Sequence, residues 1–74
     1  MSSPPPATPV TLRPVDDLKL TAPNVRLLKA QDIYYIGDLI QRTEAELRTR
    51  RFSSTAIVEI RTALWRLGLD LSKD

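Results

Sequence analysis

The sequence predicts an all-α fold: a compact orthogonal bundle of four short helices with an extended N-terminal arm. Apolar residues recur at helical spacing, hydroxyl residues that can cap helices precede the periodic segments, and no segment alternates like a strand. A chain of 74 residues has room for one domain with a simple core. We expect that helical domain over residues 11–71, after a disordered proline-rich tail or linker over 1–10 and before a frayed end over 72–74.

The composition argues against catalysis. The chain has no cysteine and no histidine, which removes disulfides, thiolate or imidazole metal sites, and every nucleophile paired with histidine. So short a chain also has few residues with which to enclose a cleft that excludes water. We expect a binding module that is not an enzyme and needs no cofactor, no metal and no small-molecule substrate.

Charge is polarised along the chain. Eleven Lys and Arg against nine Asp and Glu give a net charge of +2, with the acids concentrated in the first part and the arginines in the last third. No run of apolar residues reaches the length of a membrane span, and the start lacks the apolar core of a signal peptide. We therefore expect no membrane partner and a cytoplasmic, nucleoid-associated protein.

The first twenty residues should consist of a tail and then an arm that lies across the helical domain. Residues 1–9, MSSPPPATP, contain four of the six prolines and no segment to bury, which is typical of a mobile linker; docking of these prolines on an aromatic groove is the alternative. Pro14 prevents a continuous helix over residues 10–20. We expect extended chain and then a single turn starting near Pro14, with Asp16 and Asp17 facing solvent.

The first helix should run from an N-cap at Thr21 to Ala30. Pro23 is tolerated in its first turn, where a missing amide has no partner to lose. The apolar side of this helix consists of Val25, Leu27 and Leu28.

The segment over residues 33–47, IYYIGDLIQRTEAEL, should hold the next two helices. Ile36, Leu39 and Ile40 have the spacing of one buried face. Gly37 within that short helix predicts that another backbone passes close to it. Thr43 and Glu46 form a capping-box pattern, which predicts that a third helix starts there.

The last helix has the clearest pattern in the sequence. Phe52 should anchor the loop before it, and Ser53 or Ser54 should cap it. Its buried stripe is predicted to consist of Ile57, Ile60, Leu64 and Leu67. Gly68 stands where a left-handed residue closes a Schellman turn. We expect residues 70–74 to fray.

Three aromatic residues leave alternatives open. Trp65 lies on a side of the last helix turned away from the stripe, and we favour its burial beneath residues 10–15 over an exposed role as an interface anchor. Tyr34 and Tyr35 should point in different directions, one to the core and one to the surface. Stacking of these tyrosines on unpaired bases is the weaker alternative.

Four short helices with tight turns are typical of helix-hairpin-helix (SAM-like) folds. The segments LRPVDDLKLT, LLKAQDIYYIGDLIQRTEAEL and VEIRTAL resemble the C-terminal domain of the bacterial RNA polymerase alpha subunit, over roughly residues 12–71. Members of that family hang on a flexible linker, bind the minor groove of promoter DNA, and contact activators and the sigma factor. The resemblance implies the same fold and a transcription-associated role, in a divergent or paralogous member.

The resemblance carries over unevenly. It implies a sigma-facing edge at Asp16 and Asp17 and an activator-facing edge at Thr43, Glu44 and Glu46. In the DNA-binding surface, Pro23 stands where the family has an arginine that enters the minor groove, and Arg26 stands where it has an asparagine. Ser53, Ser54, Thr55 and Ala56 replace a Gly-Lys-Lys-Ser turn that holds phosphate, while Glu59 is retained.

Two hypotheses of function follow. In the first, the domain still binds A·T-rich DNA, weakly or without sequence preference, through phosphates. Its site would consist of Arg26, Lys29, Arg50, Arg51, Ser53, Ser54, Thr55 and Glu59. The alternative is a protein-interaction module that kept the fold but lost DNA binding. Its partner would be RNA polymerase, the sigma factor or a transcription regulator. Its contact residues would be Asp16, Asp17, Thr43, Glu44, Glu46 and Trp65.

Overall fold

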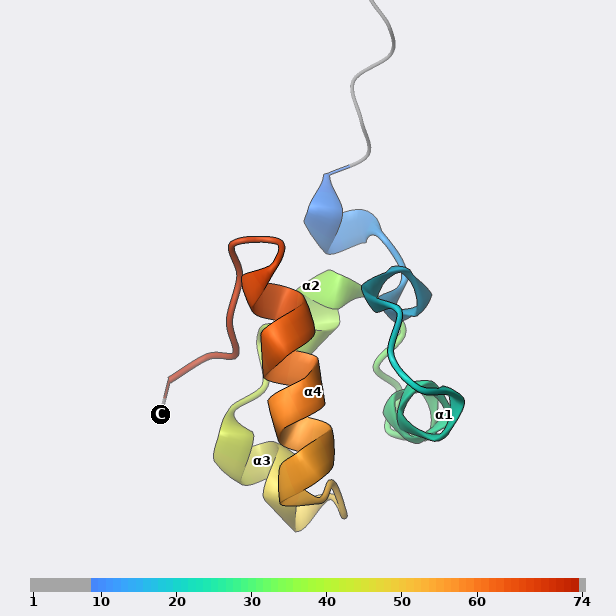
Figure 1. The fold of residues 1–74 in the computed structure, drawn as a ribbon, viewed down its shortest axis with the longest axis vertical. Coiled ribbons are helices and arrows are strands. Elements are labelled where there is room, and N and C mark those ends of the chain that lie inside the picture. Colours follow the sequence, from blue (N-terminus) through green and yellow to red (C-terminus); the bar gives the residue numbers. More distant parts are fainter. Residues whose placement is uncertain (1–8, 74) are drawn as a thin grey trace, which may run out of the picture.

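The longest helix, α4 (Ser54–Trp65), lies at the centre of the molecule (Figure 1). The computed structural model describes residues 9–73, so the predicted tail over 1–10 falls mostly outside the described residues. Within these, the other elements are η1 (Val10–Leu12), η2 (Val15–Leu18), α1 (Ala22–Ala30), α2 (Ile36–Leu39) and α3 (Glu44–Thr49). Two isolated bridges occur, but no strand is present over residues 9–73, which confirms the all-α prediction.

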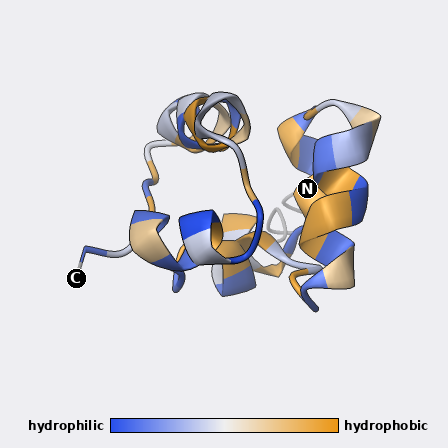
Figure 2. Ribbon diagram, turned by 90° about the horizontal axis from the view of Figure 1, so that it is seen from below, coloured by the Kyte–Doolittle hydropathy of each residue, from blue (hydrophilic) through white to orange (hydrophobic). Residues whose placement is uncertain are grey.

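The helices cross steeply instead of running parallel. Figure 1 shows α1 end-on while α4 runs in the plane of the view, and Figure 2 shows the same pair turned, with hydrophobic and hydrophilic residues on every helix. Short amphipathic helices bury one side each against a shared core. That core includes Ile36, Leu39, Ile60 and Leu64, each without solvent exposure, as predicted.

The N-terminal arm is wound into a short helix, which corrects the expectation of extended chain before Pro14. The amide of Leu12 donates to Pro9 O and that of Arg13 to Val10 O, so residues 10–12 form the 3₁₀ turn η1. This turn packs on α2. A Cβ added to Gly37 would lie 2.8 Å from the backbone oxygen of Thr11, which confirms the predicted close approach of another backbone.

The caps match the sequence in part. Ser53 Oγ accepts from the amide of Ala56, and the amide of Leu69 donates to Leu64 O across Gly68, whose φ is +75°, as a Schellman turn requires. Thr43 Oγ1 accepts from the amide of Glu46, but the reciprocal half of the predicted capping box is absent, because the Glu46 carboxylate instead meets Arg42.

The C-terminal end is more ordered than we expected. Leu71 is buried, and Ser72 donates from its hydroxyl to Ile40 O (2.6 Å) and from its amide to Arg42 O (3.0 Å). These bonds form a bridge beside Thr43. Residues 70–72 are therefore fixed against the start of α3, where fraying had been expected.

Three predicted core positions lie at the surface: Leu67, Trp65 and one of the two adjacent tyrosines. Leu67 is 40% exposed because the regular helix ends at Trp65. Trp65 is 55% exposed, which corrects the expectation of burial: the arm that should have covered it packs on α2 instead. Tyr34 and Tyr35 are both exposed, since Ile33 and Ile36 on either side fill the core.

Candidate nucleic-acid interface

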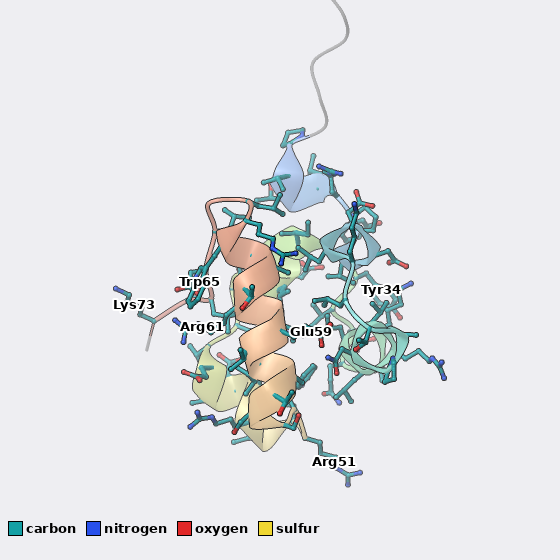
Figure 3. All side chains as sticks on the ribbon, in the orientation of Figure 1. Tyr34, Arg51, Glu59, Arg61, Trp65 and Lys73 are labelled. Atoms are coloured by element: carbon teal, nitrogen blue, oxygen red, sulfur yellow. The ribbon has the colours of Figure 1, made fainter. Side chains whose placement is uncertain are left out.

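Glu59 joins α4 to the start of α1. Its carboxylate accepts from the amide of Thr21 (2.8 Å), from the Thr21 hydroxyl (3.3 Å) and from the side-chain amide of Asn24. Figure 3 shows Glu59 pointing from α4 towards α1. With these donors the carboxylate is already engaged within the protein, which lowers its power to repel a phosphate nearby.

Sequence analysis missed Asn24. It follows Pro23, which occupies the first turn of α1 and has no amide to donate. The resemblance places an arginine at position 23, where this chain has proline. Asn24, the next residue, has a side-chain amide that can donate to a carboxylate such as Glu59, and this was the feature of the sequence that could have pointed to it.

The loop between α3 and α4 presents two arginines. Arg50 caps the end of α3 and donates to Gln31 Oε1 (3.1 Å), which ties this loop to the end of α1. Arg51 has a left-handed backbone with φ of +72°, and its side chain extends away from the body of the molecule (Figure 3). Both side chains are exposed.

The start of α4 offers two unused hydroxyls. Ser53 Oγ is occupied by its own cap, whereas Ser54 and Thr55 are exposed in the first turn. The first amides of a helix have no partner within it, so an anion approaching this end meets backbone donors as well as hydroxyls.

The cations of the described residues divide into paired and unpaired groups. Most arginines outside the α3–α4 loop meet a carboxylate: Arg13 with Asp17, Arg42 with Glu46, Arg48 with Glu44, and Arg61 with Glu44 and Asp70. Within residues 9–73, Arg26, Arg50, Arg51 and Arg66 make no ion pair, and the first three of these belong to the predicted DNA site. Lys29, predicted to contact DNA, meets Asp16 at 3.0 Å instead.

The predicted protein-contact residues form two separate groups. Asp16 and Asp17 lie at the surface of η2 and are held by Lys29 and Arg13. Thr43, Glu44 and Glu46 lie at the start of α3. Trp65 belongs to the second group, because Arg61, whose guanidinium lies over the indole ring, also pairs with Glu44 at 3.7 Å. The structure therefore does not bring all six residues to one surface.

Trp65 is part of a polar cluster. The guanidinium of Arg61 lies 5.0 Å from the centre of the indole ring and donates to both carboxylate oxygens of Asp70 (3.2 and 3.3 Å). The hydrogen bonds from Arg61 are the main cause that lowers the pKa of Asp70 below its usual value, and the indole of Trp65 is the second. The guanidinium is thus fixed over the ring, which orients the exposed indole.

Two further features bear on function. No helix over residues 9–73 is long and apolar enough to cross a membrane. In the same described part of the molecule, no group of three or more acidic, cysteine or histidine side chains gathers as a metal site would require.

Most of the sequence matches a known protein family. Residues 3–66 match the C-terminal domain of the alpha subunit of bacterial RNA polymerase. The match covers both halves of the molecule, including Glu59 and the loop before α4.

Proposed function

The protein belongs to the family of C-terminal domains of the bacterial RNA polymerase alpha subunit, a non-catalytic module associated with transcription, and we propose that it binds DNA weakly through phosphates. The observation that carries this proposal is the set of arginines without carboxylate partners. Arg26, Arg50 and Arg51 are exposed and unpaired within residues 9–73, while most other arginines there are neutralised. Unpaired cations are available to replace the counterions of DNA.

The surface supports phosphate binding better than base recognition. Arg26 lies on α1, and the Arg50–Gln31 bond places the loop before α4 beside the end of the same helix. Ser54 and Thr55 add hydroxyls at the start of α4. Pro23 offers no side-chain donor to a base edge. Contacts to phosphate position a protein on the duplex but carry no sequence information.

The experiment is a fluorescence anisotropy titration of a labelled A·T-rich duplex at several salt concentrations. If about four phosphates are contacted, the slope of log affinity against log salt should be about −4. A G·C-rich duplex of the same length should bind within a few-fold. An affinity that does not change with salt would contradict the proposal.

Matched variants locate the site. Arg26→Ala and Arg51→Ala should each make the salt slope shallower by about one unit. Arg48→Ala removes the same charge from an arginine paired with Glu44, and it should leave the slope nearly unchanged. Equal losses in all three variants would mean that net charge, rather than this surface, drives binding.

A second candidate is a protein contact through Trp65. The 55% exposed indole, oriented by Arg61, supports it, because tryptophan and arginine are the commonest energetic centres of interfaces. As Trp65 is the single tryptophan, 5-hydroxytryptophan incorporated at its position can be excited at wavelengths where the tryptophans of a partner do not absorb, so acrylamide quenching of that emission reports on this site alone. Addition of RNA polymerase lacking its own alpha C-terminal domains, or of a sigma factor, should protect the indole. Unchanged quenching with both would exclude these partners at Trp65.

A further inference from the structure

A groove lies between η2 and the C-terminal half of α4. It consists of two adjoining hollows, of about 270 and 220 Å³, which share Leu18, Lys19, Ala63 and Arg66 in their walls. Leu18 and Ala63 are buried and form its floor, whereas Lys19 and Arg66 are exposed. The groove thus combines apolar surface with two cations.

Neither cation has a partner within the described part of the molecule. Over residues 9–73, Lys19 and Arg66 form no ion pair and no side-chain hydrogen bond, unlike Arg13 and Lys29 close by. Two acids also line the groove, but both are engaged elsewhere. Asp17 accepts from Arg13 (2.8 Å) and Glu59 from the start of α1. Arg13 neutralises Asp17, whereas Glu59 keeps its charge because its donors are uncharged, so Lys19 and Arg66 still outweigh the one remaining negative charge.

The apolar surface of the groove is also uncovered. Leu67, at the end of α4, lines the smaller hollow and is 40% exposed, although its spacing belongs to the buried stripe of the helix. A ligand that carries an apolar group next to a carboxylate would bury the aliphatic side chain of Leu67 and form an ion pair with the neighbouring arginine, and both contacts favour binding.

We propose that this groove binds an acidic peptide segment of a partner protein, whose apolar side chain sits on Leu18, Ala63 and Leu67 while its carboxylates meet Lys19 and Arg66. Because Lys19 and Arg66 are positively charged, the groove should bind an acidic partner rather than a basic one. The exposed side chain of Leu67 favours a peptide over a nucleic acid, because a phosphate backbone would leave that side chain uncovered. Ion pairs at a protein surface add little each, so the complex should be weak and dissociate readily.

The test is an NMR titration of the ¹⁵N-labelled 74-residue protein with a synthetic peptide that has a leucine flanked by Asp and Glu on both sides. Amide shifts should concentrate at residues 18–20 and 62–67. Two matched peptides separate the contributions. One has lysine in place of every acid and should not bind, while the other has alanine in place of leucine and should bind several-fold more weakly.

Charge reversal provides the decisive variant. Lys19→Glu combined with Arg66→Glu should weaken binding of the acidic peptide by about tenfold or more, by losing two ion pairs and adding repulsion. The same variant should bind the lysine peptide, which wild type does not. Arg26→Glu combined with Arg51→Glu changes net charge equally and should leave peptide binding within about twofold, since neither residue lines the groove and exposed charges are screened by salt.

Three results of the titrations would overturn the proposal. These are no change in amide shifts when the acidic peptide is added, equally strong binding of the acidic and lysine peptides, or shift changes that map to Arg26 and Arg51. A duplex affinity that depends on Lys19 and Arg66 as strongly as on Arg26 and Arg51 would assign the groove to nucleic acid. Should the double reversal unfold the protein, Lys19→Gln and Arg66→Gln decide, because peptide binding unchanged in both would contradict a role for either cation.

Discussion

Glu59 links two helices that are far apart in the sequence. Its carboxylate oxygens accept from the backbone amide and hydroxyl of Thr21 and from the side-chain amide of Asn24, at a helix start where Thr21 makes no cap of its own. A carboxylate from another helix thus accepts from the N-cap amide, as the glutamate of a capping box does, and its negative charge lies at the positive end of α1.

Replacement of Glu59 tests this role. Glu59→Ala should lower the free energy of unfolding by about 1–2 kcal/mol, because three donors lose a charged acceptor. The measurement is urea unfolding followed by circular dichroism. Glu46→Ala is the control, since its carboxylate meets one exposed arginine at 3.4 Å, and such pairs are worth at most about 1 kcal/mol. A loss in Glu59→Ala no larger than in the control would remove Glu59 from this role.

Asp70 should make Trp65 fluorescence sensitive to acid. Hydrogen bonds from Arg61 are the first cause that lowers the pKa of Asp70 below its ordinary 3.8. The folded state therefore holds the carboxylate ionised to lower pH than the unfolded state does. The contribution to stability is present above the ordinary value and is lost as pH falls through the lowered pKa.

The readout is the emission of Trp65 against pH. It should show a transition below pH 3.8 in wild type and none in Asp70→Asn, because protonation releases Arg61 from its position over the ring. Asp32→Asn, an exposed site away from this cluster, should keep the transition. A transition that persists in Asp70→Asn would assign it to another carboxylate.

At the scale of elements, Gly37 is where η1 and α2 meet. The backbone oxygen of Thr11 lies where a Cβ of residue 37 would need space, and backbone atoms have no rotamer by which to move aside. Gly37→Ala should therefore destabilise the fold by about 1–3 kcal/mol, despite the higher helix propensity of alanine.

Gly68 supplies the comparison for that measurement. Gly68→Ala meets no atom within 4 Å but must adopt φ near +75°, which costs about 1–2 kcal/mol in strain alone. Gly68→Asn should recover part of this loss because asparagine tolerates left-handed backbone, whereas Gly37→Asn should be worse than Gly37→Ala. If Gly37→Ala raises the denaturant midpoint, η1 does not pack on α2 as described.

Local patterns predicted the elements whose cause is local. The start of α3 at Thr43, the cap at Ser53 and the Schellman turn at Gly68 depend on neighbours within a few residues, so the sequence reveals them. The docking of Ser72 on Ile40 depends on residues 32 positions apart. The same limit explains Trp65, whose exposure follows from where the arm packs.

For the whole molecule, the sequence indicated which residue types could form the candidate sites, but not which of their charges would be paired in the folded protein. Residue type alone led to the prediction that Arg26, Arg50 and Arg51 contact DNA, but it could not indicate that Lys29 would pair with Asp16. The groove with Lys19 and Arg66 was not anticipated, because its cations are 47 positions apart and only folding places both in one wall. Ion pairing in three dimensions decides which charges remain for a ligand.

Arg51 and Arg66, one from each set of unpaired cations, lie near opposite ends of α4. Arg51 precedes its start and Arg66 follows its end, and twelve helical residues span about 18 Å. That separation exceeds the Debye length, about 10 Å at roughly 0.1 M salt, so anions bound at the two ends should repel each other only weakly.

Duplex and acidic peptide should therefore bind the domain together. At roughly 0.1 M salt, a saturating concentration of duplex should lower the affinity for the labelled peptide by no more than a few-fold. This decrease should become larger as salt is lowered, because the Debye length increases. The measurement is peptide anisotropy with and without duplex, with Lys19→Glu combined with Arg66→Glu as the variant that removes the peptide signal alone. Strict competition, in which each ligand displaces the other in proportion, would mean that the arginines before α4 and the groove at its end form one anion-binding surface.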